Sequence, residues 1–259
     1  MKRTITYLFL SALLCLCGQA QLSAKHKNVS LRLTSYNIQH GEGMDKRIDH
    51  ARIARILRKA KAQVVAVQEV DSMTRRNGNV YALEEIGKKA HMHDTYAPAI
   101  DFQGGKYGIG MLSKKRPVSV RRIPLPGREE PRMLLVVEFK NYVVACTHLS
   151  LTEADRLTSA EIICKEAARW QKPFIVTGDL NDEPQSEFYR RMQEHFLFLN
   201  SPNEMTFPSK GPNICIDHIA LYRNPAVTVS YHRTWVGPEQ SSDHCPLHVR
   251  IGLYFEQSR

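Results

Sequence analysis

Short apolar runs of strand length recur from Val29 to Ile251, and they constrain the fold of this chain more than any other feature. Val29, Leu31 and Leu33 alternate with polar residues, which is the pattern of a strand with one buried face. The run from Val64 to Val67 is continuously apolar, which is the pattern of a strand covered on both faces. The chain is therefore expected to build its core on β-sheets.

Helical patterns separate several of these runs. The segment 47–62 carries an apolar stripe at helical spacing, with basic residues elsewhere. We predict further helices at 81–92, 153–170 and 186–194, and strands at 29–37, 64–67, 108–112, 118–123, 133–139, 142–147, 174–177, 214–221, 227–231 and 247–251. No tract rich in proline, glycine or serine divides the 259 residues, and 42% of them are hydrophobic. A single α/β domain on two sheets is the simplest packing of these elements.

The N-terminus has the features of a secretory signal peptide. Met1-Lys2-Arg3 is basic, the following run to Cys17 is apolar, and small residues stand at Gly18 and Ala20. We predict cleavage after Ala20 and a secreted or periplasmic protein. An uncleaved anchor helix is the alternative, but the apolar run is shorter than the roughly 20 residues of a membrane span. The mature chain is expected to lack a stable span and to be a monomer.

The formal net charge of +10 invites an anionic partner such as nucleic acid, a lipid headgroup or a phosphate ester, without choosing among them. Two basic clusters, Lys114-Lys115-Arg116 and Arg121-Arg122, are expected at the solvated edges of a hairpin, with a binding patch as the alternative. Four cysteines remain after cleavage, and export would allow disulfides. Buried thiols are an equally good interpretation of Cys146, Cys215 and Cys245, which lie in apolar runs.

Several apolar runs end in side chains that bind metals or move protons, where turn-forming residues would be usual. Each alone has an ordinary explanation, such as a turn cap. Together they supply hard oxygen ligands and, in His148 and His244, two imidazoles, the requirement of a Mg²⁺- or Mn²⁺-dependent phosphoryl-transfer site. These residues are Asn37, Glu69, His148, Asp179 with Asn181, Asp217 with His218, and Asp243 with His244.

In this order the motifs resemble those of the endonuclease/exonuclease/phosphatase superfamily. They are Ser35-Tyr36-Asn37-Ile38, Gln68-Glu69-Val70, Thr147-His148-Leu149, Gly178-Asp179-Leu180-Asn181, Ile216-Asp217-His218-Ile219 and Ser242-Asp243-His244-Cys245-Pro246. The resemblance implies a domain over 30–252, after an extension at 21–29 and before a tail at 253–259. It also implies a four-layered sandwich of two mainly antiparallel β-sheets flanked by helices.

The resemblance assigns roles residue by residue. Glu69 matches the metal-ligand glutamate, supported by Asn37 and Asp243. His244 matches the histidine that activates or orients the attacking water, and Asp217 matches the aspartate that fixes its ring. Asp179 and Asn181 match the pair around the phosphate and the nucleophile. His148 resembles the second histidine of the deoxyribonuclease and sphingomyelinase branches.

The expected activity is divalent-metal-dependent hydrolysis of phosphate esters, with a phosphodiester as the favoured substrate. Nucleic acid and a phospholipid headgroup are both compatible with the motifs. The alternatives are a phosphomonoesterase of the inositol-phosphate type and a catalytically silent binding protein on the same scaffold. Arg132 is a further candidate for a phosphate contact, and Lys106 or Tyr107 could overhang the site.

Overall fold

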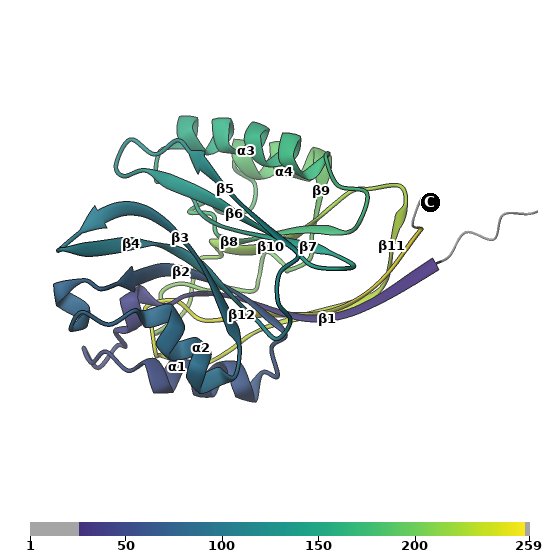
Figure 1. The fold of residues 1–259 in the computed structure, drawn as a ribbon. Coiled ribbons are helices and arrows are strands. Elements are labelled where there is room, and N and C mark those ends of the chain that lie inside the picture. Colours follow the sequence, from purple (N-terminus) through teal and green to yellow (C-terminus); the bar gives the residue numbers. More distant parts are fainter. Residues whose placement is uncertain (1–25, 257–259) are drawn as a thin grey trace, which may run out of the picture.

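The computed structural model describes residues 26–256, which form two six-stranded sheets packed face to face (Figure 1). In spatial order, the first sheet contains β11 (Val227–Val236), β12 (Leu247–Glu256), β1 (His26–Asn37), β2 (Val64–Ser72), β4 (Gly105–Ser113) and β3 (His93–Phe102). The second contains β5 (Ser119–Leu125), β6 (Arg132–Glu138), β7 (Val143–His148), β8 (Phe174–Asp179), β10 (Asp217–Tyr222) and β9 (Phe196–Phe198).

Helices cover the outer face of each sheet, so the domain has four layers. Helices α1 (His50–Lys59) and α2 (Ala82–Ala90) pack on the first sheet, and α3 (Glu153–Ala167) and α4 (Glu187–His195) on the second. Only β1 with β2 and β7 with β8 pair in parallel, and the other strand pairs within the two sheets are antiparallel. The predicted sandwich of two mainly antiparallel sheets in one domain is confirmed.

Burial follows the periodicity of the sequence. Leu31 and Leu33 of β1 lie in the apolar layer between the sheets. In β2, Val64 and Ala66 enter that same layer, whereas Val65 and Val67 pack against the helices outside. The continuous apolar run is therefore explained, because β2 is covered on both faces.

Two strands were not predicted, and several bounds differ. The edge strand β3 is largely polar and half exposed, and it contains Pro98, so it lacks a strand pattern. β9 has three residues, which are too few to show a strand pattern. β10 begins at Asp217 rather than at Ile214, and β1 and β12 extend to His26 and Glu256. The helices were found at their predicted places: α1, α2 and α3 are shorter than predicted, and α4 is shifted by one residue.

The predicted signal peptide lies outside the described residues, as do residues 21–25 and 257–259. No helix in the described part of the chain combines the length and apolarity needed to cross a membrane. The four cysteines of the described part, Cys146, Cys164, Cys215 and Cys245, are free thiols, and all but Cys164 are buried.

Candidate active site

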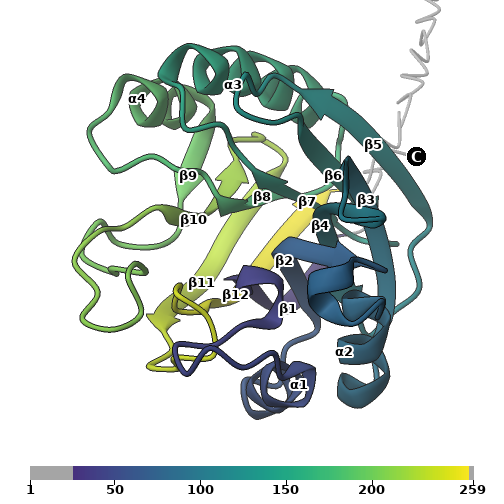
Figure 2. The ribbon, with the colours of Figure 1, turned by 90° about the vertical axis from the view of Figure 1, so that its left-hand side faces the viewer.

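The polar residues that follow the apolar runs meet at one end of the sandwich. Figure 2 views the molecule from the side at which β1 ends, with α1 and α2 below and α3 and α4 above. His148 at the end of β7 pairs in register with Asp179 at the end of β8, and Asp179 pairs with Asp217 at the start of β10. Strand register therefore brings together side chains that lie far apart in the sequence.

Gly178 makes this register possible. It pairs with Thr147, and a Cβ at position 178 would lie 1.9 Å from the Thr147 carbonyl oxygen. Its φ of 154° is also one that side chains rarely adopt. Only glycine therefore fits directly before Asp179.

Substitution Gly178→Ala is expected to lower the free energy of unfolding by about 3 kcal/mol or more, because the β7–β8 pair must separate to admit the methyl group. Gly211→Ala is the matched control. Gly211 also has a positive φ, of 81°, but nothing lies within 4 Å of an added Cβ. Urea denaturation should show a loss of only about 1 kcal/mol there. Equal losses at the two positions would mean that the close approach at Gly178 has no energetic role.

Asn37 links the two sheets at the site. Its side chain is fully buried, and Nδ2 donates to Glu69 Oε1 at 2.9 Å and to Asp179 Oδ2 at 3.0 Å. Its Oδ1 accepts a hydrogen bond from the backbone N–H of Gln39 at 3.1 Å. One amide therefore holds a carboxylate from each sheet in a fixed place.

Glu69 lies inside β2 rather than at the end of a strand, which corrects the expectation. The pairing of β2 with β4 shifts register between Val67 and Val70, and Glu69 has a φ of 57°. A bulge of this kind re-aims a side chain, here toward the site. Burial raises the pKa of Glu69, and the charges of Asp243 and Asp179 raise it further, against the hydrogen bond from Asn37.

His244 and Asp217 form a buried hydrogen-bonded pair. His244 Nδ1 lies 2.8 Å from Asp217 Oδ2, and His244 Nε2 lies 3.5 Å from Asp179 Oδ2. Burial acts to lower the pKa of His244, but the carboxylates of Asp217 and Asp179 outweigh it and raise this pKa to about 10. The His244 ring is therefore protonated at neutral pH as long as no cation neutralises the carboxylates of Asp217 and Asp179.

His148 has the opposite electrostatic environment. Its Nε2 lies 3.5 Å from Asp179 Oδ2. Burial lowers the pKa of His148 to about 4, with help from the positive charge of Arg132, while Asp179 opposes the shift. At neutral pH His148 is therefore a neutral imidazole that can donate one hydrogen bond.

Asn181 is positioned by the turn after β8. Its φ is 49°, its backbone N–H donates to Asp179 Oδ1 at 3.0 Å, and its Nδ2 donates to the Leu149 carbonyl at 2.9 Å. An asparagine tolerates this left-handed backbone at little cost. The Asp179-to-Asn181 motif is therefore a turn whose side chains face the site.

The donor set fits a divalent cation. Asp179, Asp217 and His244 each offer a ligand atom, and these atoms lie within 4.8 Å of one another. Asp217 Oδ1 is buried without a hydrogen-bond partner, which is costly unless something binds there. Glu69 adds a carboxylate from the other sheet. Oxygen-rich donors of this kind suit hard cations.

Asp243 is less closely integrated than the other predicted residues. It is half-buried, and its Oδ1 accepts a hydrogen bond from Ser242 Oγ at 3.1 Å. No hydrogen bond within residues 26–256 joins its side chain to Asn37 or Glu69, although its charge raises the pKa of Glu69. Its role as a ligand stays a prediction.

A cavity of about 560 Å³ opens over these residues. Tyr107 and Arg132, which were weighed from the sequence, belong to its wall. The residues that the sequence did not indicate are Glu129, Glu130, Leu151, Phe207, Ile214 and Ile216, and the predicted ones are Glu69, His148, Asp179, Asn181 and His244. The Phe207 ring packs on the His244 ring with centroids 4.8 Å apart. None of the unpredicted residues carries a pattern that would mark it for the site, apart from the charges of Glu129 and Glu130 just before β6.

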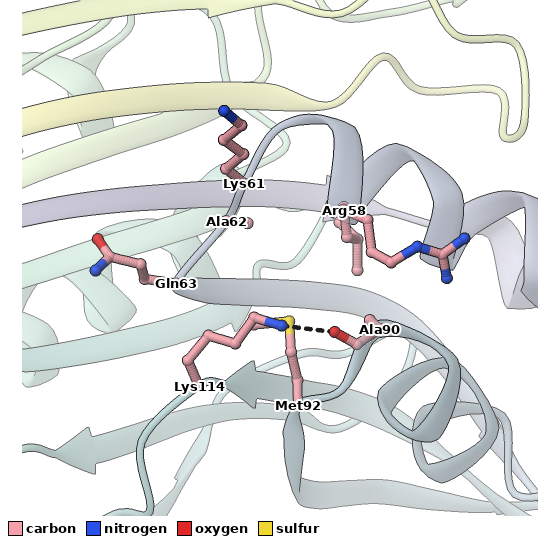
Figure 3. A pocket seen from close by; sticks show the side chains of 8 residues that line it. Arg58, Lys61, Ala62, Gln63, Ala90, Met92 and Lys114 are labelled. Atoms are coloured by element: carbon pink, nitrogen blue, oxygen red, sulfur yellow. Dashed lines mark hydrogen bonds between the residues drawn. The ribbon is translucent and has the colours of Figure 1, made fainter.

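The basic cluster at Lys114 has a structural use in a second pocket of about 280 Å³ (Figure 3). Lys114 Nζ donates to the Ala90 and His91 carbonyls at 2.7 and 3.1 Å, and Arg58 Nη1 donates to the Lys89 carbonyl. These bonds satisfy carbonyl groups at the C-terminus of α2. Lys114 and Arg58 are thus already engaged, and Figure 3 shows Arg58 and Lys61 pointing in different directions.

The family model described as the endonuclease/exonuclease/phosphatase family matches residues 34–244. The chain belongs to this family. Its members are phosphoester hydrolases, so the family assigns the chain to that broad class of enzyme. The predicted motif resemblance is confirmed.

Solved structures agree on the fold. An endonuclease/exonuclease/phosphatase from Bacteroides vulgatus has a TM-score of 0.70 and 17% identity, covering 88% of this chain and 100% of its own. A mannosyl-6-phosphatase from Bacteroides thetaiotaomicron has a TM-score of 0.65 and 16% identity, covering 86% and 99%. ANGEL2, a 2′,3′-cyclic phosphatase, has a TM-score of 0.65 and 15% identity, covering 92% and 100%. A search of curated proteins found no significant match.

Proposed function

We propose that the chain is a secreted, divalent-metal-dependent hydrolase of phosphate esters. The observation that carries the proposal is the convergence of Asn37, Glu69 and Asp179 beside the Asp217–His244 pair at one cavity. Carboxylates, a buried unpaired oxygen and a carboxylate-linked histidine are the groups that phosphoryl transfer requires.

Glu69 and Asp179 would hold the cation, with Asn37 fixing both carboxylates and Asp217 offering its free oxygen. We propose Mg²⁺ or Mn²⁺, because the ligands are mostly oxygen and few, and these ions keep several waters. When bound, the ion supplies positive charge to the nonbridging phosphate oxygens.

The protein side chains position the water, accept its proton and bind the phosphate. Asp179 and Asn181 position the attacking water. His244 would accept the water's proton through Nε2, which lies 3.5 Å from Asp179 Oδ2. A cation held by Asp179 would lower the pKa of the ring from its raised value, because the Asp179 carboxylate is one of the charges that raise it. Asp217 holds the ring through Nδ1 and stabilises its charged form. His148, neutral and buried, donates a hydrogen bond to the phosphate or the leaving oxygen.

A phosphodiester, in nucleic acid or a phospholipid headgroup, is the substrate that the motifs favour. A phosphomonoester is the second candidate, favoured by the single guanidinium in the cavity wall. The fold supports both chemistries, since relatives of this fold are named as a mannosyl-6-phosphatase and as a 2′,3′-cyclic phosphatase.

Chelation tests the proposal. Activity on bis(p-nitrophenyl) phosphate and p-nitrophenyl phosphate is expected to vanish in excess EDTA and to return with Mg²⁺ or Mn²⁺, because the carboxylates cannot neutralise phosphate themselves. Thermal unfolding with and without the ions provides the control that the chelated protein stays folded. Full turnover in EDTA would contradict the metal dependence. No turnover of any ester by the metal-loaded protein would favour the silent binding protein.

Secretion and a monomeric state are also proposed, the first from the N-terminal sequence. N-terminal sequencing of exported protein should begin at Gln21. A chain that retains Met1 in the membrane fraction would indicate the anchor helix instead.

A further inference from the structure

The charge of the cavity wall limits what alcohol a substrate can carry. Besides Glu69 and Asp179, the wall contains the carboxylates of Glu129 and Glu130, and its one guanidinium belongs to Arg132. With the metal ligands set aside, the wall is more acidic than basic. Such a wall repels an alcohol that brings further negative charge.

Arg132 is the natural partner of a single phosphate group. Arg132 is 6% exposed, and its Nη1 donates a hydrogen bond to Glu130 Oε1 at 2.8 Å. Its Nε is buried without a hydrogen-bond partner. A buried unpaired N–H is costly, and a guanidinium matches phosphate oxygens in geometry and charge. Glu130 thus positions the guanidinium of a residue that lines the cavity, and one N–H of that guanidinium has no acceptor.

Three cations close to the wall residues are paired with carboxylates. Arg128 pairs with Asp155 at 3.0 Å, and Lys106 pairs with Asp101. Arg156 pairs with Asp182 at 2.8 Å and also donates to the Leu151 carbonyl at 2.7 Å. Proteins that bind nucleic acid need unpaired cations along a stripe to meet successive phosphates. These three cations do not provide that stripe.

The rest of the wall suits a compact, uncharged group. Phe207, Ile214 and Ile216 are apolar, and Leu151 is 66% exposed. Glu129 is exposed, and its two oxygens accept hydrogen bonds from Thr152 and Ser150. Each carboxylate oxygen can accept more than one hydrogen bond, so hydroxyl groups of a ligand can still bind there.

We propose that the substrate is a small phosphate ester with one phosphate, bound by Arg132, and an uncharged polyhydroxylated alcohol, bound between Glu129 and the apolar wall. This inference rests on the proposed function and narrows its substrate to the second candidate, the phosphomonoester, because the charge of the wall disfavours nucleic acid. Water adds its oxygen to phosphorus, the bond from phosphorus to the alcohol oxygen breaks, and the alcohol leaves with a proton from the water. A sugar and a cyclitol share this chemistry.

A substrate panel tests the class. With Mg²⁺ bound, kcat/KM for glucose 6-phosphate, mannose 6-phosphate or myo-inositol 1-phosphate should exceed that for a single-stranded oligonucleotide and for inositol trisphosphate by at least 100-fold. Comparing kcat/KM for the two sugar phosphates with that for myo-inositol 1-phosphate distinguishes a sugar substrate from a cyclitol substrate. An oligonucleotide or trisphosphate hydrolysed equally well would overturn the inference while leaving the proposed function intact. If even the p-nitrophenyl esters are not hydrolysed, the proposed function itself fails.

Charge reversal at the wall tests the cause of the selectivity. Glu129→Lys should raise the ratio of kcat/KM for inositol trisphosphate to that for the monophosphate at least tenfold. The matched control is Glu153→Lys, which makes the same change at an exposed site in α3 outside the wall. The control should leave the ratio unchanged. A ratio that does not move in Glu129→Lys contradicts a role for wall charge.

Binding of inorganic phosphate tests Arg132 without turnover. By titration calorimetry of the metal-loaded protein, Arg132→Ala should bind phosphate at least tenfold more weakly, and guanidinium ion should restore part of the affinity. Arg132→Lys keeps the charge and covers the case in which the alanine variant does not fold. Wild-type phosphate affinity in both variants would show that Arg132 has only a structural role.

Discussion

Substitution of His244 by alanine is expected to lower kcat by about 10³-fold, and Asp217→Asn by a similar factor, because the two side chains act through one hydrogen bond of 2.8 Å. When two side chains act as a unit, removing either one abolishes the rate enhancement that both provide. The double variant should therefore be little slower than the slower single variant. Steady-state kinetics on an aryl phosphate ester measures all three.

His248→Ala is the control for this cycle. His248 is also buried, and its Nδ1 lies 2.9 Å from Thr34 Oγ1, but it is not part of the cavity wall. Its loss should reduce stability and leave kcat nearly unchanged. Additive losses for Asp217→Asn and His244→Ala would contradict the pair as one catalytic unit and would leave Asp217 as a structural carboxylate.

The sequence predicted the scaffold where burial is periodic and local. The alternation in β1 and the continuous apolar run in β2 each reflect how many faces of the strand are covered. The polar residues at strand ends were found because they interrupt that pattern. Since parallel strands end at one edge of a sheet, their ends converge, as His148 and Asp179 do.

Features that depend on long-range packing were not predictable. The bulge that turns Glu69 toward the site arises from pairing with β4, some forty residues away. His218 follows Asp217 directly, yet strand alternation turns it away, and its Nε2 lies 2.9 Å from the Asp182 carbonyl. The apolar wall at Phe207 comes from a loop whose sequence has no periodic pattern.

Glu69→Gln is expected to weaken metal binding and to lower kcat/KM by about 10³-fold at fixed Mg²⁺, the rate equivalent of several kcal/mol. Glutamine keeps the size of the side chain and can still accept the Asn37 hydrogen bond, so the fold should persist. It removes the one carboxylate that β2 contributes to the cavity. The measurements are titration calorimetry with Mg²⁺ and kinetics across a range of Mg²⁺ concentrations.

The control makes the same chemical change away from the site. Glu138→Gln removes a carboxylate on β6 that pairs with Lys172, outside the cavity. It should change neither the Mg²⁺ affinity nor the rate. If Glu69→Gln retains the wild-type Mg²⁺ dependence, Glu69 is not a ligand, and the cation must lie with Asp179, Asp217 and His244, whose ligand atoms already converge without it. Mg²⁺ affinity that falls in Glu69→Gln and not in Glu138→Gln would instead show that Glu69 binds the ion. Because Asn37 holds Glu69 next to Asp179, the ion would then lie where the two sheets meet.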